Sequence, residues 1–363
     1  MVTDVLSEPL PPIHVVQLAT QPRCNANCVF CPYIEAPHAK AKGVMPLDLF
    51  YKILEELKEF PLINSPKGRF HPYLIQDPLL DKQIVEKLET IHAYFPETNI
   101  SISTNPIALA PALHDRLIDL FSKLPRHEFI VSYHGINPES MRHIMALDFE
   151  RSEANMVAFL KKAGGRMDVE VKGLGSSRFK DLHYFTQQDY ETYWERLFEK
   201  HQIDSSRVKV HYGVFHDRAG TIRREERDAK LITVGQVREI DAEHPFYCPQ
   251  IDRWIQIDWD GNLRWCCMDW PNEISLPNMK DITLREYFAS DRYKTLVAMT
   301  LGTVESPADF ICKRCTWPIN DDNGKHMQNL LVKPSAADPT RNEPWESGGT
   351  KQEPLFQLRY PSA

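Results

Sequence analysis

The chain has 363 residues, of which 42% are hydrophobic and 26% charged, and 43 Lys and Arg against 50 Asp and Glu give a formal net charge of −7. This length can bury a sizeable core, and the ordinary hydrophobic fraction with mixed charges excludes collagen-like, low-complexity and wholly disordered classes. No apolar run reaches the roughly 18 residues that span a bilayer, no export signal is visible, and the acidic balance disfavours nucleic acid. We therefore expect a cytoplasmic protein that binds neither membrane nor nucleic acid.

The first predicted strand, Ile13–Thr20, leads directly into three closely spaced cysteines. These are Cys24, Cys28 and Cys31. In a reducing compartment such spacing indicates a metal site rather than a disulfide framework. Three thiolates on one loop can hold three corners of an iron–sulfur cube and leave its fourth iron open for chemistry. Zinc is the alternative, and it would need a fourth ligand such as His14 or His38.

Strand-like and helix-like segments then alternate along the chain. The further predicted strands are Tyr73–Gln76, Asn99–Thr104, Glu128–Tyr133, Asp168–Lys172 and Arg207–Val214. Apolar residues at helical spacing form four stripes between them. The stripes comprise Phe50, Ile53, Leu54 and Leu57; Ile84, Val85, Leu88 and Ile91; Leu113, Leu117, Leu120 and Phe121; and Tyr190, Tyr193, Trp194, Leu197 and Phe198. Repeated strand–helix units predict an α/β fold with a parallel sheet, either open or closed as part of a barrel.

Polar residues gather at the predicted carboxyl ends of these strands, where parallel α/β folds carry their sites. They are Gln76 and Asp77, Thr104 and Asn105, Ser132 and His134, Lys172, and His216 and Asp217. The histidines, the lysine and Asp217 are candidate bases. His134 is the preferred one because it lies just beyond Ser132. Arg178 is a candidate for binding an anionic substrate group.

From about Gln236 the pattern changes. A strand over Trp254–Trp259, the turn residues Asp260–Asn262 and a return over Leu263–Cys267 predict a hairpin. Five further cysteines lie in this part of the chain, namely Cys248, Cys266, Cys267, Cys312 and Cys315. They offer four ligands and one spare thiol. Strand alternation places the adjacent pair on opposite faces, so we expect only one of the two to face a metal site.

The first motif, directly after a first strand and with Phe30 just before its last cysteine, resembles the radical S-adenosylmethionine (SAM) superfamily. The later cysteines resemble that family's SPASM/twitch extension through their spacing, Cys248, Gly261-x4-Cys266 and Cys312-x2-Cys315. The resemblance covers about residues 13–320. It implies a partial (βα)6 TIM-like barrel over residues 13–235 and a small, hairpin-containing cluster domain over residues 236–330. Residues 331–363 lack periodicity, and we expect a mobile tail there.

The resemblance implies a [4Fe-4S] cluster held by Cys24, Cys28 and Cys31, on which SAM is reductively cleaved to a 5′-deoxyadenosyl radical. It also implies an auxiliary [4Fe-4S] cluster and a flavodoxin- or ferredoxin-type electron donor. The implied auxiliary ligands are Cys248, Cys266, Cys312 and Cys315. The positions implied to approach SAM are Phe30 beside the adenine, Gln76, Asp77, Thr104, Asn105 and Ser132. Ile75-Gln76-Asp77 stands where the family has Gly-Gly-Glu, so the close approach that glycines allow is lost there.

The spare thiol, Cys267, is either a small buried hydrophobic group or a hydrogen donor to a substrate radical. If Cys267 donates a hydrogen atom, the reaction is expected to be an epimerisation. A dehydrogenation instead needs a base such as His134 and an auxiliary cluster that accepts an electron. We expect a radical SAM oxidoreductase or epimerase that acts on a small polar molecule such as a sugar or aminocyclitol. A peptide-modifying maturase is the alternative, which the 23 residues before Cys24 disfavour because a leader-binding domain would not fit there. An iron–sulfur electron carrier or a zinc-stabilised binding module is the alternative from another class.

Overall fold

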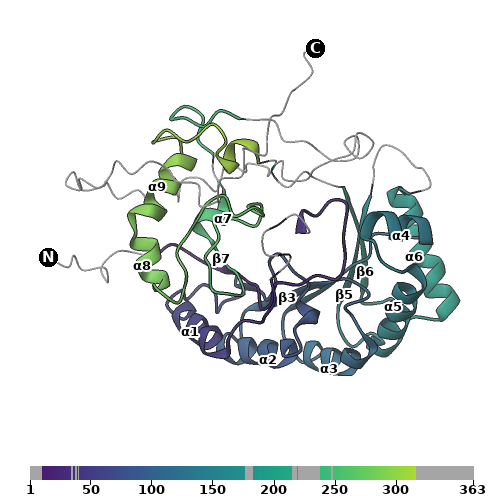
Figure 1. Cartoon of the computed structure of the whole chain (residues 1–363). Coiled ribbons are helices and arrows are strands. Elements are labelled where there is room, and N and C mark those ends of the chain that lie inside the picture. Colours follow the sequence, from purple (N-terminus) through teal and green to yellow (C-terminus); the bar gives the residue numbers. More distant parts are fainter. Residues whose placement is uncertain are drawn as a thin grey trace, which may run out of the picture.

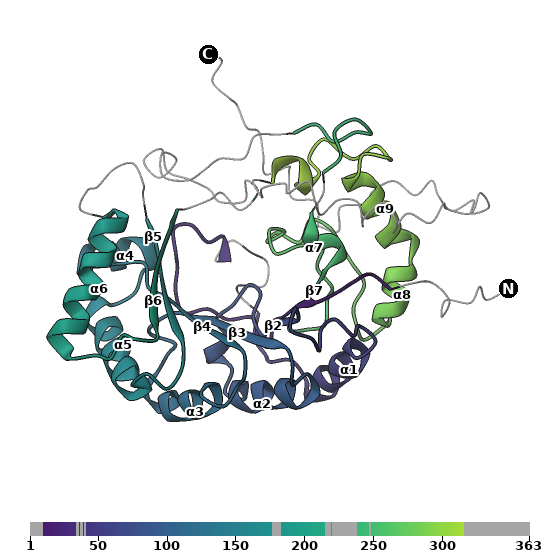
Figure 2. The same cartoon turned by 180° about the vertical axis from the view of Figure 1, so that it is seen from behind.

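A computed structural model describes residues 10–33, 36, 39, 41–175, 183–214, 219, 238–246 and 248–315. Seven parallel strands form one open sheet in the order β6-β5-β4-β3-β2-β1-β7. The strands are β1 Val15–Leu18, β2 Arg69–His71, β3 Asn99–Thr104, β4 His127–Ser132, β5 Val169–Gly175, β6 Val208–Val214 and β7 Trp254–Ile257. The sheet curves into a crescent with helices along its outer side (Figures 1 and 2). The expected partial α/β barrel is therefore confirmed.

The helices that follow the strands bury the predicted apolar stripes against the outer side of the sheet. They are α1 Leu47–Leu57, α2 Ile84–Tyr94, α3 Pro111–Phe121, α4 Pro138–Met145, α5 Phe149–Ala163 and α6 Gln187–His201. On α3 the buried face is turned from the expected one. His114 and Ile118 are buried with Leu117 and Phe121, and the predicted Leu113 and Leu120 are only partly buried. The remaining helices are η4 Pro78–Leu80, α7 Pro249–Asp252, α8 Leu284–Ala289, α9 Asp291–Thr300 and η6 Ile311–Arg314.

The two faces of the sheet differ in chemistry because helices cover only one of them. On β5 the residues Val169 and Val171 are buried under the helices, whereas Glu170 and Lys172 point the other way and are half-buried. Strands covered on one side alternate in this manner. The inner, concave face of the crescent, here called the concave wall, therefore carries polar side chains such as Glu170 and Lys172 together with the apolar Ile130 and Leu174.

The second strand does not lie where the sequence predicts it. β2 is Arg69–His71, and the predicted segment Tyr73–Gln76 follows it as irregular chain. Pro72 ends the strand because it has no N–H to donate. Beyond it, the N–H groups of Leu74 and Ile75 both donate to the side-chain oxygen of Gln76, at 3.0 Å each, instead of to a neighbouring strand.

The predicted hairpin also differs from the structure. Its first strand, β7, is shorter than expected and pairs in parallel with β1 as part of the main sheet. The return is limited to an antiparallel bridge between Ile257 and Leu263 and a hydrogen bond from Arg264 N to Gln256 O at 2.9 Å. Gly261 permits the turn with a φ of +94°. The expected domain boundary at residues 235 and 236 and the expected tail over residues 331–363 lie outside the described residues.

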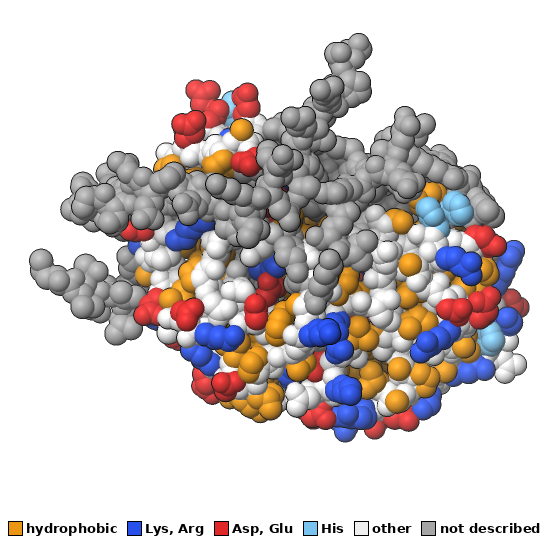
Figure 3. All heavy atoms as spheres, in the orientation of Figure 1, with side chains coloured by type: hydrophobic (Ala, Val, Ile, Leu, Met, Phe, Trp, Pro, Cys, Tyr) orange, Lys and Arg blue, Asp and Glu red, His pale blue; other side chains and the backbone are white. Residues whose placement is uncertain are grey.

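The surface carries charges of both signs. Figure 3 shows Lys and Arg side chains interspersed with Asp and Glu side chains over the helical part of one face. None of the described helices is long and apolar enough to cross a membrane.

Candidate functional site

The loop after β1 carries the first three cysteines. Cys31 N donates to Cys28 O at 2.9 Å, which makes a tight turn at the end of the motif. At its start, Cys24 N donates to the Tyr33 hydroxyl at 2.8 Å. The middle of the loop is fixed to the end of α4, where Val29 N donates to Ile144 O at 3.0 Å. In Figure 1 this purple segment runs inside the crescent, as expected for a site at the carboxyl ends of the strands.

The thiols of this loop lie in an environment that suits metal-bound thiolates. Burial, together with the negative charges of Asp77 and Cys31, raises the pKa of the Cys24 thiol to about 12. A thiol in such a place becomes a thiolate only when a cation compensates the charge. None of the eight cysteines forms a disulfide bond. In the described part of the chain, no three His, Cys, Asp or Glu side chains are grouped as ligands of a single ion.

His134 contacts this loop directly. Its ring packs edge-to-face on Phe30, with 4.9 Å between the ring centroids and 81° between the planes. Both side chains are buried. Ser132, two residues earlier, ends β4 and lies in register with Lys172 of β5. The preferred base and the aromatic residue of the motif are thus brought together.

Asp77 is the centre of a buried hydrogen-bond network that joins the loops after β2 and β3. It accepts hydrogen bonds from Thr104 Oγ1 at 2.8 Å and from both the backbone N and the side-chain Nδ2 of Asn105, at 2.8 and 2.7 Å. Burial nevertheless raises the pKa of the Asp77 carboxyl to about 6. Three residues that the sequence predicts to approach SAM therefore contact one another.

Two polar residues that the sequence reasoning missed extend this network to the cysteine loop. Gln21 is fully buried, and its Nε2 donates to the backbone oxygens of Asp77 and Arg23, at 2.7 and 2.9 Å. Asn105 Nδ2 also donates to Asn25 Oδ1 at 2.6 Å. The signal in the sequence that could have identified these two residues is the presence of polar residues on both sides of Cys24. The loops after β1, β2 and β3 are thereby fixed to one another.

Gln76 leaves a polar group available beside this network. Its Oε1 accepts from two backbone N–H groups, which fixes the orientation of the amide. Its Nε2 is buried and has no hydrogen-bond partner among the described residues. A buried donor of this kind is costly unless a ligand or water satisfies it.

The second group of cysteines lines one apolar cavity. The cysteines are Cys248, Cys266, Cys312 and Cys315, and the other walls include Phe246, Ile251, Trp265, Met268 and Ile311. Burial raises the pKa of the Cys312 thiol to about 12. The pKa of the Cys248 thiol is raised by burial and by the charge of Cys312. Burial around this apolar cavity disfavours the thiolate forms of Cys248, Cys266 and Cys312, and iron would compensate the charge of such thiolates. Four cysteines in this arrangement fit a multinuclear metal cluster.

Cys267 is absent from the lining of this cavity. Its Sγ donates to Gln250 Oε1 at 3.2 Å, and Gln256 Nε2 donates to the same oxygen at 3.1 Å. Tyr73 is close enough for the charge of Cys267 to contribute to the raised pKa of its hydroxyl, about 12, of which burial is the main cause. The adjacent cysteines therefore have different surroundings, although neither of them lies in a strand as the sequence predicted.

The segment after Cys267 returns to the first cysteine loop. Trp270 packs in a small apolar cluster with Tyr33 and Ile75, and Cys24 and Cys31 pack against this cluster. The two groups of cysteines are thus connected by one short piece of chain.

One further candidate is not brought to the site. His14, a possible zinc ligand, precedes the amino end of β1, whereas the cysteines follow its carboxyl end. The remaining candidates, His38, Arg178, His216 and Asp217, lie outside the described residues.

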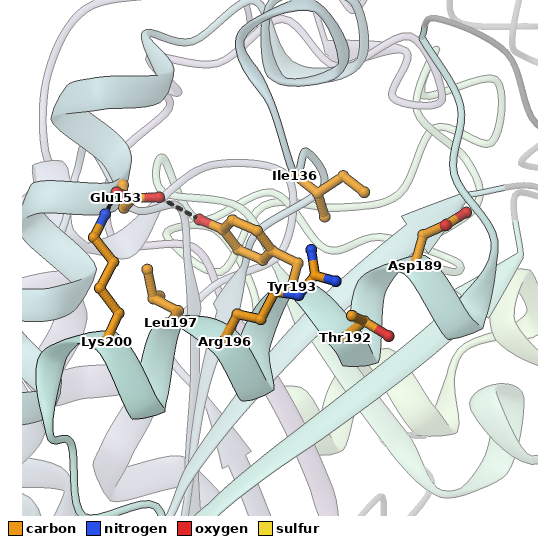
Figure 4. Close-up of a pocket in the computed structure, with 8 residues that line it drawn as sticks. All are labelled: Ile136, Glu153, Asp189, Thr192, Tyr193, Arg196, Leu197 and Lys200. Carbon is orange, nitrogen blue, oxygen red and sulfur yellow. Dashed lines mark hydrogen bonds and ion pairs between the residues drawn. The ribbon is translucent and has the colours of Figure 1, made fainter.

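A groove on the outer side of the barrel is shown in Figure 4. It is lined mainly by α6, with Glu153 of α5 and Ile136 after β4. Tyr193 donates to Glu153 Oε2 at 3.0 Å, and its hydroxyl also lies 2.9 Å from that of Tyr133. Because the groove lies in the helical layer, away from the cysteines, we assign it no part in the reaction.

Comparison with known families agrees with this arrangement. Residues 18–175 match the radical SAM superfamily, and residues 248–316 match the iron–sulfur cluster-binding domain SPASM. The chain belongs to the radical SAM superfamily and carries a SPASM domain. Members of this superfamily are enzymes, and the two domains imply SAM, a SAM-binding [4Fe-4S] cluster and an auxiliary iron–sulfur cluster.

Two solved structures share the fold. BtrN in complex with AdoMet and 2-DOIA has 15% identity and a TM-score of 0.51, and the match covers 84% of this chain and 93% of that one. SuiB of Streptococcus suis, bound to the precursor peptide SuiA, has 12% identity and a TM-score of 0.52, over 84% of this chain and 71% of that one. None of the curated proteins compared with the chain matches it.

Proposed function

We propose that the protein abstracts a hydrogen atom from a small polar substrate, a sugar or related cyclic polyol, and completes a dehydrogenation or an epimerisation. The observation that carries the proposal is the presence of two cysteine groups in one α/β barrel, one on the loop that follows β1 and one around an apolar cavity. SAM bound at the first cluster supplies a 5′-deoxyadenosyl radical on reductive cleavage. An external flavodoxin- or ferredoxin-type donor would provide the electron.

Each part of the site has a role in this proposal. Cys24, Cys28 and Cys31 hold the SAM-binding cluster, and Phe30 lies beside the adenine. The Asp77–Asn105 network fixes the loops that surround SAM. The unpartnered Nε2 of Gln76 suits the carboxylate of SAM, because that group needs a donor. Ser132, at the end of β4, approaches SAM from the strand side.

The fate of the substrate radical depends on two further residues. His134, buried against Phe30, would accept the proton in a dehydrogenation. Cys267 would donate a hydrogen atom in an epimerisation, since its thiol lies outside the auxiliary cavity and is not needed as a ligand. The auxiliary cluster would be held by the four cysteines that line the cavity. In a dehydrogenation it would accept the electron that the substrate loses.

The two relatives suggest different substrates, because BtrN was solved with the small molecule 2-DOIA and SuiB with a peptide. The half-buried polar residues of the concave wall favour a small polar molecule. A peptide substrate is the alternative.

The test is the cleavage of SAM by the reconstituted, reduced protein. We expect formation of 5′-deoxyadenosine by the wild type and its loss in Cys28→Ala. Ser122→Ala, on the surface after α3, is the control and should match the wild type. Cleavage that survives in Cys28→Ala, or a colourless protein that contains zinc, would refute the proposal.

A further inference from the structure

The concave wall carries paired charges. Arg69 of β2 forms an ion pair with Glu128 of β4, with 2.9 Å between Nη1 and Oε1. Glu170 of β5 lies 3.7 Å from Lys209 Nζ and 3.6 Å from His211 Nδ1, both on β6. Each carboxylate of this wall thus has a basic side chain as its neighbour.

Lys172 is a charged residue of the same wall that differs from these pairs. It lies on the same face as Glu170, two residues closer to the carboxyl end of β5, and it is in register with Ser132 and His211. Its side chain is half-buried, and no described residue forms a hydrogen bond or an ion pair with its ammonium group. A partly desolvated cation of this kind gains most from an anion that is brought to it.

The position of Lys172 connects it to the candidate site. Neighbouring strands lie about 4.8 Å apart, so its backbone is one strand away from Ser132. Two residues beyond Ser132, His134 packs against Phe30 of the cysteine loop. Lys172 therefore stands on the open wall beside the segment that contacts the loop.

Three uncharged side chains lie side by side at the opposite end of the wall. Gln17, His71 and Gln256, on the adjacent strands β1, β2 and β7, are buried there and share one face. Burial, with a contribution from Arg69, lowers the pKa of His71 to about 4, so its imidazole is neutral near neutral pH. The described charges of the wall are thus Arg69, Glu128, Glu170, Lys209 and His211, which are paired when His211 is protonated, and Lys172.

We propose that Lys172 binds an anionic group of the substrate, so that the substrate is an acidic sugar-like molecule bearing a carboxylate or phosphate rather than an aminocyclitol. This inference rests on the proposed function and narrows its substrate class. A substrate amine would be repelled by the ammonium group, whereas a carboxylate or phosphate forms a charge-assisted hydrogen bond with it.

The test measures binding rather than turnover. Glucose, glucosamine, glucuronate and glucose 6-phosphate are titrated calorimetrically into the SAM-loaded holoenzyme. These probes share a ring and differ in charge, and the two anionic ones distinguish a carboxylate from a phosphate. We expect at least one anionic probe to bind about tenfold or more tightly than glucose, with a preference that weakens as salt is added.

Variants test whether Lys172 causes the preference for an anionic sugar. Lys172→Ala and Lys172→Met should remove it, and Lys172→Glu should transfer it to glucosamine. Lys209→Ala is the matched control, because Lys209 is on the same wall but lies beside Glu170, and it should keep the preference. Equal binding of glucose and both anions, binding of none of the four, or a preference that survives in Lys172→Ala would overturn the inference. Failure of the wild type to cleave SAM, measured separately without sugar, would instead refute the proposed function.

Discussion

Asn105 donates two hydrogen bonds to a single carboxylate oxygen of Asp77, one from its backbone N at 2.8 Å and one from its side chain at 2.7 Å. The same side-chain nitrogen reaches Asn25 Oδ1 in the cysteine loop. One amide therefore connects three of the loops that surround the proposed SAM site. A buried acceptor that loses such donors is left partly unsatisfied.

Asn105→Ala should weaken SAM binding without removing the first cluster, because the cysteines remain while their neighbouring loops lose a fixed position. We also expect the free energy of unfolding to fall by about 1–3 kcal/mol. Calorimetric titration with SAM and chemical denaturation measure the two effects. Asn64→Ala, at an exposed position, is the matched control. Unchanged SAM affinity in Asn105→Ala would contradict the role of the network.

Cys312→Ala should lose about half of the bound iron and keep part of the SAM cleavage, because it removes a wall of the auxiliary cavity and leaves the first loop intact. Iron analysis and assay of 5′-deoxyadenosine test this. Iron content equal to that of the wild type would contradict the assignment of Cys312 as a ligand of the auxiliary cluster.

Cys266→Ser and Cys267→Ser form a matched pair on adjacent residues. Only Cys266 lines the cavity, so Cys266→Ser should lose auxiliary iron whereas Cys267→Ser should keep it. If the reaction is an epimerisation, the wild type in deuterated water should place deuterium in the product and Cys267→Ser should not. Iron loss in Cys267→Ser alone would reverse the assignment of the two thiols.

His71 should make stability depend on pH. Its pKa in the folded protein is lowered from 6.5 to about 4 by burial and by Arg69. The unfolded chain therefore binds more protons between these values, and stability is lost as the pH falls below about 6.5. Between pH 7 and pH 5 the contribution is about 2 kcal/mol.

His71→Phe removes the titrating group and keeps an aromatic ring beside Trp254, whose plane lies 12° from that of His71. Its free energy of unfolding should fall less between pH 7 and pH 5 than that of the wild type, by about 2 kcal/mol. Denaturant titrations at the two pH values measure the difference. The same slope in both proteins would show that His71 does not titrate in this range.

The sequence predicted the parallel sheet and its cysteine groups because these depend on local patterns. Strand β3 has the predicted bounds, and Cys248 and Cys312 line one cavity, in agreement with the ligand set that the family resemblance implied. The second strand was misplaced because the apolar run Tyr73–Gln76 has strand composition, while its N–H groups are bound by the Gln76 side chain. A hydrogen bond from backbone N–H groups to a nearby side chain leaves no trace in the periodicity of the sequence.

Other features depended on contacts between distant segments. The buried position of Gln21 follows from its bond to the backbone of Asp77, 56 residues away, and nothing in its own neighbourhood predicts that partner. The pairing of β7 with β1 was missed for the same reason, since a hairpin accounts for the local alternation just as well.

That pairing has a consequence for how the molecule is assembled. β1 lies between β2 and β7, so during synthesis it stays an unpaired edge until Trp254–Ile257 has left the ribosome. The strand that leads into the first cysteines, β1, is thus paired on its second edge by β7, the last strand before Cys266. A nascent or truncated chain that stops before residue 254 would expose this edge to other chains, and capture of iron by a correctly folded loop must await nearly the full length of the described sheet.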